Sequence, residues 1–391
     1  MTDKIVVEDV YKIFGPQPEI AHEMIGQGKS KEEIFEETGN TVGVQQASFS
    51  IREGEIFVVM GLSGSGKSTM VRMLNRLIDP TYGTVKVLGE DITKMSREEL
   101  IEVRRTKMSM VFQSFALMPH QTVLQNAAFG LEVAGRDRAE REKRAMAALE
   151  QVGLKANANS YPSELSGGMK QRVGLARALA VSPEILLMDE AFSALDPLIR
   201  TEMQDELLEL QKQEQRTVVF ISHDLDEAMR IGDRIAIMEQ GKVVQIGTPE
   251  EIVTNPADDY VRSFFYGVDV TKVFHGGDLA RRDCCSVIDD SGSSAEQVRE
   301  QMQRDGHGSA VLLDADGHFK GVLTLGSLEH AGDVESACLD DIKTADSDMP
   351  LGEVLSLVAH ADVPLPVVGK DGEYLGSVSQ AHLLQTLDRT G

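Results

Sequence analysis

Residues 61–69 read GLSGSGKST, and this stretch constrains the fold more than any other part of the chain. The apolar run at 56–60 predicts a buried strand before it, and 70–78 carries apolar residues at helical spacing after it. The spacing G-x-x-x-x-G-K-[ST] alone is common by chance, whereas a strand, a glycine loop and a helix together are typical of a phosphate cradle. We therefore expect an α/β domain that contains this loop.

The loop offers the groups that bind a nucleoside triphosphate. Its glycines let the backbone wrap closely, so that successive N–H groups and the positive helix end face anionic oxygens. Lys67 supplies a point charge to the outer phosphates, Ser68 offers a hydroxyl to Mg²⁺, and Thr69 can bond a phosphate oxygen nearer the base. We expect a bound triphosphate here rather than an empty glycine turn.

The composition excludes several classes of protein. The formal charge of -24 and the pI near 4.8 argue against a nucleic acid polymer as the main ligand, because such a ligand needs its phosphates neutralised. Cys284, Cys285 and Cys338 have neither the number nor the spacing of a disulfide framework or a zinc site. No apolar run is long enough to span a bilayer, and the N-terminus lacks the apolar region of a signal peptide. If the protein serves a membrane, we expect it on the cytosolic side.

The N-terminal region predicts a further sheet. Residues 5–10 alternate like a strand that leads to Phe14, and 42–51 resume this pattern after a polar segment at 17–41. We interpret 17–41, which is helical in parts, as an insertion between two edge strands. Residues 85–88 close this sheet region.

Residues 108–112 predict another strand, which ends at Gln113, and the pattern then turns helical from about 114 to 180. The clearest helices are 138–152 and 170–179. We expect a helical subdomain inserted in an α/β core.

Residues 165–172 read LSGGMKQR and open the second of these helices. Ser166, Gly167 and Gly168 occupy its N-terminal turn, where a hydroxyl, backbone N–H groups and the helix dipole make a second anion site. Taken alone, the stretch is better interpreted as a serine cap followed by a glycine turn; the motif that follows favours the anion site.

Two adjacent carboxylates follow the apolar strand 185–188. Asp189, at the tip of a buried strand beside a phosphate loop, suits Mg²⁺. Glu190 is placed to orient or deprotonate an attacking water.

A turn at 193–196 then leads into a helix at about 197–211, and the apolar strand 217–222 ends in His223. A lone histidine at a strand end is more often structural than catalytic. Because ligands gather at the carboxyl ends of parallel strands, we nevertheless expect His223 near Asp189.

In this order and spacing, the motifs resemble the ATP-binding subunit of an ABC transporter over residues 1–266. In that family's terms they are the Walker A loop (61–69), the Q-loop (Gln113), the signature (165–172), Walker B (185–190), the D-loop (193–196) and the switch histidine (His223). The resemblance implies a P-loop ABC ATPase with a RecA-like core sheet, an antiparallel β subdomain and a helical subdomain, and it implies ATP and Mg²⁺ as cofactors.

The resemblance is closer to one branch, the glycine betaine/proline betaine importers of osmoprotection. It rests there on residues 111–120, 188–200 and 223–233 and on the insertion at 17–41. This implies an ATPase that energises import of a quaternary-amine compatible solute.

The resemblance also implies roles for individual residues. The catalytic residues would be Glu190, His223, Gln113 and Lys67, and the Mg²⁺ ligands would be Ser68, Gln113 and Asp189. Phe14 would stack on adenine, unless it is a core residue. The nucleotide-binding residues would be Phe14, Gly61, Ser63, Gly64, Ser65, Gly66, Lys67, Ser68, Thr69, Ser166, Gly167, Gly168 and Asp196.

The implied partners are a second copy of the chain in a head-to-tail homodimer, an integral membrane permease and, through the permease, a solute-binding protein. The apolar loop 115–123 would receive a coupling helix of the permease. The implied location is peripheral, on the cytoplasmic face of the inner membrane.

The C-terminal part, 267–391, contains an internal repeat. DGHFKGVLT at 316–324 recurs as DGEYLGSVS at 371–379, and an apolar strand precedes each copy. The repeats, at about 280–335 and 336–391, resemble an α+β tandem CBS domain.

Two roles for this region stay open, a dimerisation appendage or a regulatory pair that responds to a nucleotide or to ionic strength. Residues 267–391 hold 9 Lys and Arg against 22 Asp and Glu. Such an acidic excess argues against direct docking on anionic lipid but leaves salt sensitivity open.

Two alternative functions also stay open. An importer ATPase for another small solute, such as an amino acid or a polyamine, shares the first domain. A soluble ABC ATPase that acts on ribosomes or DNA usually carries two cassettes or a long coiled coil, and the single cassette and the acidic balance disfavour it.

Overall fold

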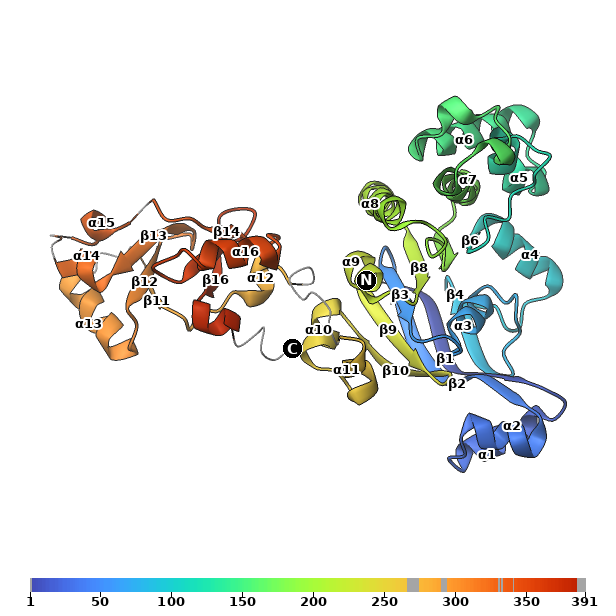
Figure 1. The fold of residues 1–391 in the computed structure, drawn as a ribbon, viewed down its shortest axis with the longest axis horizontal. Coiled ribbons are helices and arrows are strands. Elements are labelled where there is room, and N and C mark those ends of the chain that lie inside the picture. The colour runs from blue at the N-terminus through green and yellow to red at the C-terminus, as the bar shows by residue number, and fades with distance from the viewer. Residues whose placement is uncertain are drawn as a thin grey trace. The chain divides into compact units, whose positions relative to one another are not determined.

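The computed structural model describes residues 2–265, 274–289, 294–329, 331, 333–339 and 341–384. The chain forms two compact units, Met1–Ile252 with Pro256–Val261 and Val253–Asn255 with Arg262–Gly391. Figure 1 labels the helices and strands of each unit. The predicted domain boundary at 266/267 lies outside the described residues.

The first unit is built on a six-stranded sheet in the order β10-β9-β3-β8-β7-β6. Five strands run parallel, and β10 is antiparallel to β9. Every residue of β3, β7 and β8 is buried, as their continuous apolar runs predict. The strands are β3 (Ile56–Met60), β6 (Met108–Phe112), β7 (Ile185–Asp189), β8 (Thr217–Ser222), β9 (Arg234–Glu239) and β10 (Lys242–Gly247).

An antiparallel sheet in the order β2-β1-β4-β5 shares a hydrophobic core with the parallel sheet. The prediction that the insertion separates two edge strands is wrong for β1, because β1 pairs with both β2 and β4. Ile5 lies opposite Val87, and the alternation of apolar residues does not reveal so distant a partner. The strands are β1 (Asp3–Phe14), β2 (Thr41–Arg52), β4 (Tyr82–Val87) and β5 (Glu90–Asp91).

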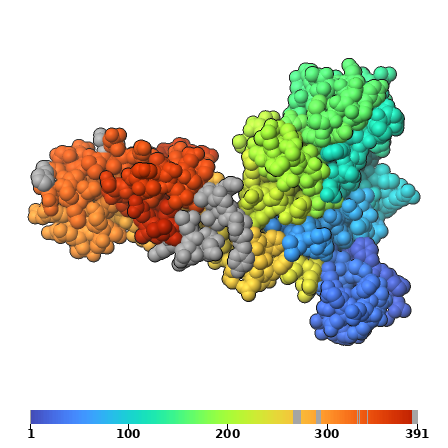
Figure 2. Space-filling view, in the orientation of Figure 1, coloured from blue at the N-terminus to red at the C-terminus, as the bar shows by residue number. Residues whose placement is uncertain are grey.

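The insertion between β1 and β2 forms two helices, α1 (Pro18–Gly26) and α2 (Lys31–Thr38). Their apolar sides pack onto the two strands in a small cluster of Ile13, Ala21, Met24, Ile34 and Val42. In Figure 2 the insertion is the dark blue lobe at the edge of the first unit.

A helical subdomain follows β6. Its third helix begins at Gly167, where Ser166 caps it, rather than at the predicted 170. The prediction placed the start too late because the two glycines have low helix propensity. The sequence pattern did not predict its first helix as an element distinct from the loop before it. The helices are α5 (Val123–Val133), α6 (Arg138–Gln151) and α7 (Gly167–Ala180), with 3₁₀ turns η1 (Lys155–Asn157) and η2 (Pro162–Glu164).

The remaining helices of the first unit connect its strands. Among the described residues, no helix has both the length and the apolar character that crossing a membrane requires. These helices are α3 (Lys67–Leu74), α4 (Arg97–Thr106), α8 (Pro197–Glu214), α9 (Leu225–Ile231), α10 (Pro249–Thr254) and α11 (Asp259–Ser263).

The second unit contains two three-stranded sheets of the same design. In each sheet the first pair of strands is parallel and the second pair is an antiparallel hairpin, which corresponds to the repeated sequence. Gly317 and Gly372 occupy the same place in the two turns, with φ of 87° and 82°. The strands are β11 (Ser286–Asp289), β12 (Ser309–Leu313), β13 (Phe319–Thr324), β14 (Ala345–Asp346), β15 (Leu365–Val368) and β16 (Tyr374–Val378).

The helices of this unit cross the predicted limits of the repeats. The limit near 335 falls inside α15, which packs with the first repeat, and α12 packs on the second sheet although it precedes the first. The helices are α12 (Gly276–Leu279), α13 (Ala295–Asp305), α14 (Leu325–Glu329), α15 (Val334–Ala337) and α16 (Leu351–Val358).

Candidate nucleotide site

The Walker A loop, residues 61–69, joins β3 to α3, and two of its glycines are required by the chain's own packing. Gly61 has φ 147°, and a Cβ there would lie 2.2 Å from the Met238 carbonyl oxygen. Gly66 has φ 104°, and a Cβ there would lie 2.5 Å from the Gly43 carbonyl oxygen. Only glycine combines these dihedral angles with such close approach, so packing within the chain fixes the course of the loop.

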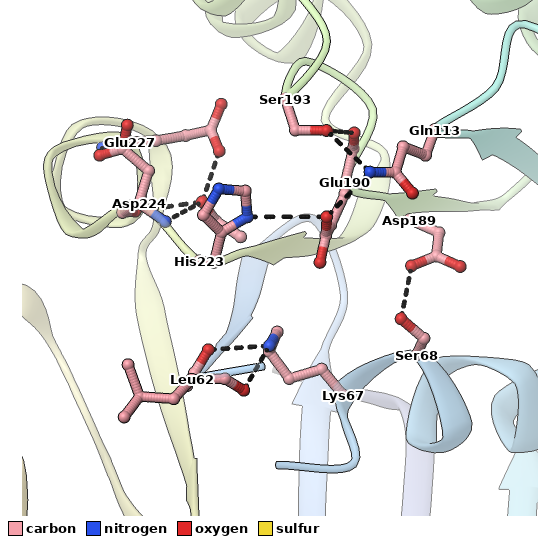
Figure 3. A network of polar contacts seen from close by, with 12 residues as sticks. Leu62, Lys67, Ser68, Gln113, Asp189, Glu190, Ser193, His223, Asp224 and Glu227 are labelled. Atoms are coloured by element: carbon pink, nitrogen blue, oxygen red, sulfur yellow. Dashed lines mark hydrogen bonds and ion pairs between the residues drawn. The ribbon is translucent and has the colours of Figure 1, made fainter. Parts of the chain in front are cut away.

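The Lys67 ammonium lies inside the loop. Its Nζ donates hydrogen bonds of 2.8 Å to the Gly61 carbonyl and 3.0 Å to the Leu62 carbonyl (Figure 3). Burial lowers the pKa of Lys67, while the nearby Glu190 and Asp189 act to raise it. The cation is thus held by neutral carbonyls, which an anionic ligand can replace.

The hydroxyl of Ser65 is a second sign of a ligand. Ser65 is 4% exposed, and its Oγ has no hydrogen-bond partner among the described residues. Buried hydroxyls are nearly always bonded, so an oxygen of a bound ligand is the expected partner. Ser63 and Gly64 lie exposed in the same loop.

Asp189 lies where a metal ion would be expected, at the carboxyl end of β7. Its Oδ1 accepts a hydrogen bond of 3.0 Å from Ser68 Oγ, and its Oδ2 lies 3.2 Å from Arg72 Nη2. A hydroxyl next to a carboxylate is a donor set that fits Mg²⁺. Arg72 was not predicted, although it lies one helical turn after Ser68, on the same face of α3.

Glu190 lies between two other predicted residues. Its Oε2 accepts a hydrogen bond of 3.2 Å from Gln113 Nε2 and lies 3.6 Å from His223 Nδ1 (Figure 3). Gln113 also lies 3.3 Å from Ser193 Oγ, which donates to the Glu190 carbonyl. Glu190 has φ 47°, a left-handed conformation that is costly for a residue with a Cβ and that concentrates at functional sites.

A buried acid that the sequence did not single out supports the turn at His223. Glu227 on α9 is 6% exposed and accepts hydrogen bonds from Gln204 Nε2, at 3.1 Å, and from Ser222 Oγ. Ser222 Oγ in turn accepts from the backbone N–H of Asp224. Burial raises the pKa of Glu227. A glutamate in a helix normally predicts a solvated face, so no sequence signal marked this one.

Phe14 ends β1 beside the Walker A loop. A Cβ on Gly43 would lie 2.8 Å from Phe14 Cε2 and 3.4 Å from Thr69 Cγ2, so the ring and Thr69 meet across that glycine. Phe14 as a whole residue is 40% exposed. The alternative that Phe14 is a core residue is therefore wrong, and a flat ligand can stack on it.

The signature turn, residues 166–168, lies apart from these groups. Ser166 Oγ accepts from the Met169 N–H at 3.3 Å, and a Cβ on Gly168 would lie 2.5 Å from Ile199 Cγ2. Asp196 similarly caps α8. In the described parts of the chain, no hydrogen bond or ion pair joins Ser166 or Asp196 to the Walker A loop.

The geometry therefore brings together Lys67, Ser68, Gln113, Asp189, Glu190 and His223, places Phe14 beside Thr69, and leaves the signature turn and Asp196 elsewhere on the unit. The chain thus contains a phosphate cradle, a carboxylate suited to a metal, and a second carboxylate held by an amide and an imidazole.

Comparisons with known proteins show which family the chain resembles. A family model described as ABC transporter matches residues 44–193, and one described as CBS domain matches 331–389. The glycine betaine/proline betaine transport system ATP-binding protein ProV of Salmonella typhimurium is 56% identical over 100% of this chain and 99% of its own. The glycine betaine transport ATP-binding protein OpuAA of Bacillus subtilis is 48% identical over 98% of this chain and 92% of its own.

A solved structure extends the likeness to the fold of the first unit. The dimeric structure of MJ0796, a bacterial ABC transporter cassette, matches with a TM-score of 0.53 and 33% identity, over 62% of this chain and 98% of that one. The chain therefore belongs to the ATP-binding proteins of ABC transporters, in the branch of the glycine betaine/proline betaine transport systems.

Proposed function

We propose that the chain hydrolyses ATP to energise the import of glycine betaine or proline betaine through a membrane permease. The observation that carries the proposal is the full-length similarity to ProV, because it spans the ATPase region and the C-terminal region together. The identity of the transported solute is also proposed, because the residues that bind it would lie on other subunits.

Several residues would act on ATP directly. Lys67 and the N–H groups of the Walker A loop would bind the phosphates, and Phe14 would stack on adenine. The Ser65 hydroxyl would gain the partner that it lacks among the described residues. Glu190 would orient or deprotonate the attacking water, since a carboxylate at this distance from a histidine and an amide is held in one orientation.

Ser68, Asp189 and Gln113 would hold Mg²⁺, which would neutralise charge on the outer phosphates. The support is the hydroxyl–carboxylate contact of 3.0 Å at the end of β7. Arg72, 3.2 Å from the other oxygen of Asp189, would keep that carboxylate oriented.

A second copy of the chain would complete the site. Ser166, Gly167, Gly168 and Asp196 are exposed or at helix starts, and none of them meets the Walker A loop of its own chain. A head-to-tail homodimer would bring the signature turn of one copy to the γ-phosphate bound by the other.

An apolar groove supports the permease as a partner. It has a volume of about 410 Å³ and lies between α4, β6, α5 and α7. Exposed Leu77, Ile101 and Val133 line it, and burial lowers the pKa of the Arg177 guanidinium in it. A helix of the permease would fill this groove, which the loop predicted for that contact, 115–123, does not line. The solute-binding protein would act through the permease. The chain would then lie peripherally on the cytoplasmic face of the membrane.

The second unit would be a tandem CBS pair, residues 267–391, attached to an ATPase domain at 1–266. The support is the matching design of its two sheets and the CBS family match over the second. We propose that the pair makes transport depend on ionic strength, with a nucleotide as the alternative signal.

The test is ATP hydrolysis by the complex reconstituted with permease and solute-binding protein in lipid, with and without glycine betaine, across a KCl series. We expect stimulation only when solute and high salt are both present, and a loss of roughly 100-fold or more in Glu190→Gln. No response to betaine at any salt would refute the cargo. Stimulation at every salt level would refute the regulatory role of the CBS pair.

A further inference from the structure

The helical insertion lies against the phosphate-binding machinery, although neither family match covers it. It is packed rather than loosely attached. The His22 ring lies 4.7 Å from the Tyr11 ring and 4.4 Å from the Tyr82 ring, and the Ser30–Glu33 capping box sets the start of α2. The first residue of α2, Lys31, is therefore held at a defined place.

That place is the turn between β9 and β10. A Cβ on Gly241 would lie 3.0 Å from Lys31 Nζ and 3.2 Å from its Cε, so the lysine covers the open side of this glycine. The Gly241 N–H donates to the Ser65 carbonyl at 2.9 Å. A Cβ on Gly66 would lie 3.4 Å from the Gly241 Cα. Only this one turn residue separates Lys31 from the Walker A loop.

The charge of Lys31 has no counter-ion in the described chain. Neither a hydrogen bond nor an ion pair is made by its ammonium there, whereas the neighbouring Lys29 pairs with Glu37. Burial lowers the pKa of Lys31, and the adjacent Glu32 only partly opposes this. A partly desolvated cation without a partner is unfavourable unless an anion binds near it.

A bound nucleotide would supply that anion. A Cβ on Gly43 would meet the Phe14 ring and Thr69, and a Cβ on Gly66 or on Gly241 would meet the Gly43 carbonyl oxygen. Gly43 thus lies next to the proposed adenine platform, to the loop and to Gly241, the glycine that Lys31 covers. The flexible four-carbon stem of a lysine lets its ammonium move from Gly241 toward an anion bound in the loop.

We propose that Lys31 is a further nucleotide-binding residue, supplied by the insertion, which contacts the anionic oxygens of the bound nucleoside triphosphate. This rests on the proposed nucleotide site in the Walker A loop. The insertion would then raise affinity for the nucleotide without entering the chemical step.

The test is equilibrium binding of a fluorescent N-methylanthraniloyl ATP and of the corresponding ADP to the full-length protein, with and without Mg²⁺. We expect Lys31→Met to weaken both about tenfold, because it removes a charged hydrogen bond, and Lys31→Arg to retain most of the affinity. Lys29→Met is the matched control in the same insertion and should bind like the wild type. In hydrolysis assays, KM should rise in Lys31→Met while kcat at saturating ATP stays within about twofold.

Equal affinities of wild type and Lys31→Met, at unchanged melting temperature, would overturn the proposal, and so would a loss of kcat at unchanged affinity. Lys67→Met distinguishes a failure of the proposed nucleotide site from a failure of the proposed role of Lys31. If it binds nucleotide as tightly as the wild type, the proposed Walker A site itself is wrong; if it loses binding while Lys31→Met does not, only the role of Lys31 fails.

Discussion

The Walker A loop and the signature turn are both glycine-containing turns that open a helix, and they differ in what requires their glycines. In the loop, Gly61 and Gly66 have positive φ and would place a Cβ against backbone oxygens of their own chain. In the signature turn, Gly168 faces Ile199, but a Cβ on Gly167 would meet nothing within 4 Å.

The two turns therefore differ in whether contacts within their own chain require glycine. Gly61 and Gly66 are explained by the fold of one chain, because a Cβ at either position would collide with the backbone of β9 or β2. No atom of the described chain requires the glycine at 167. In the proposed head-to-tail homodimer this open side would face the nucleotide bound to a second copy, and the following predictions test that arrangement.

The largest effect is expected for Gly66→Ala. Alanine would be held at φ 104° with its Cβ 2.5 Å from the Gly43 carbonyl oxygen. We expect a loss of about 3 kcal/mol or more in the free energy of unfolding, together with loss of ATP binding. Chemical denaturation and ATP titration measure the two quantities. If the variant is as stable as the wild type, the loop can accommodate a Cβ at this position, and packing within the chain does not require Gly66.

Gly167→Ala should separate stability from hydrolysis. The added methyl meets no atom of the chain, so the free energy of unfolding should stay within about 1 kcal/mol of the wild type, and ATP should bind as before. Hydrolysis by the assembled transporter should fall on the order of 100-fold, since the methyl would displace the bound phosphate. Normal hydrolysis in this variant would contradict the head-to-tail arrangement.

The smallest effect concerns pH and the support of His223. Burial raises the pKa of Glu227 above its ordinary value of 4.5, so the folded state keeps this proton to higher pH than the unfolded chain. The associated stability is therefore fully present below about pH 4.5 and is lost as the pH rises through the folded pKa. We expect Glu227→Gln to lose less stability than the wild type as the pH rises from 5 to 8, because glutamine has no proton to lose.

Denaturation curves at several pH values measure this difference. The exposed neighbour Asp226, changed to Asn, is the matched control and should follow the wild type. Parallel stability curves for wild type and Glu227→Gln would mean that Glu227 does not titrate differently in the folded and unfolded states.

Much of the site could be predicted because its residues lie in short, local patterns. Asp189 and Glu190 directly follow a continuous apolar run, and His223 follows another, so a parallel sheet brings them together. Strand limits were predicted closely where burial was complete, as in β3 and β8. The predicted edge position of β1 was wrong, because the pairing of β1 with β4 depends on residues far apart in the chain.

By itself, the sequence determined the phosphate loop, the order of the motifs, the paired carboxylates and the C-terminal repeat, because each depends on spacing within one strand, turn or helix. Only the tertiary structure decided that Arg72 meets Asp189, that Glu227 is buried beneath the turn at His223, and that Lys31 covers Gly241. Packing between separate elements sets these contacts. A charged residue in a helix looks solvated in the sequence until another element is known to cover it.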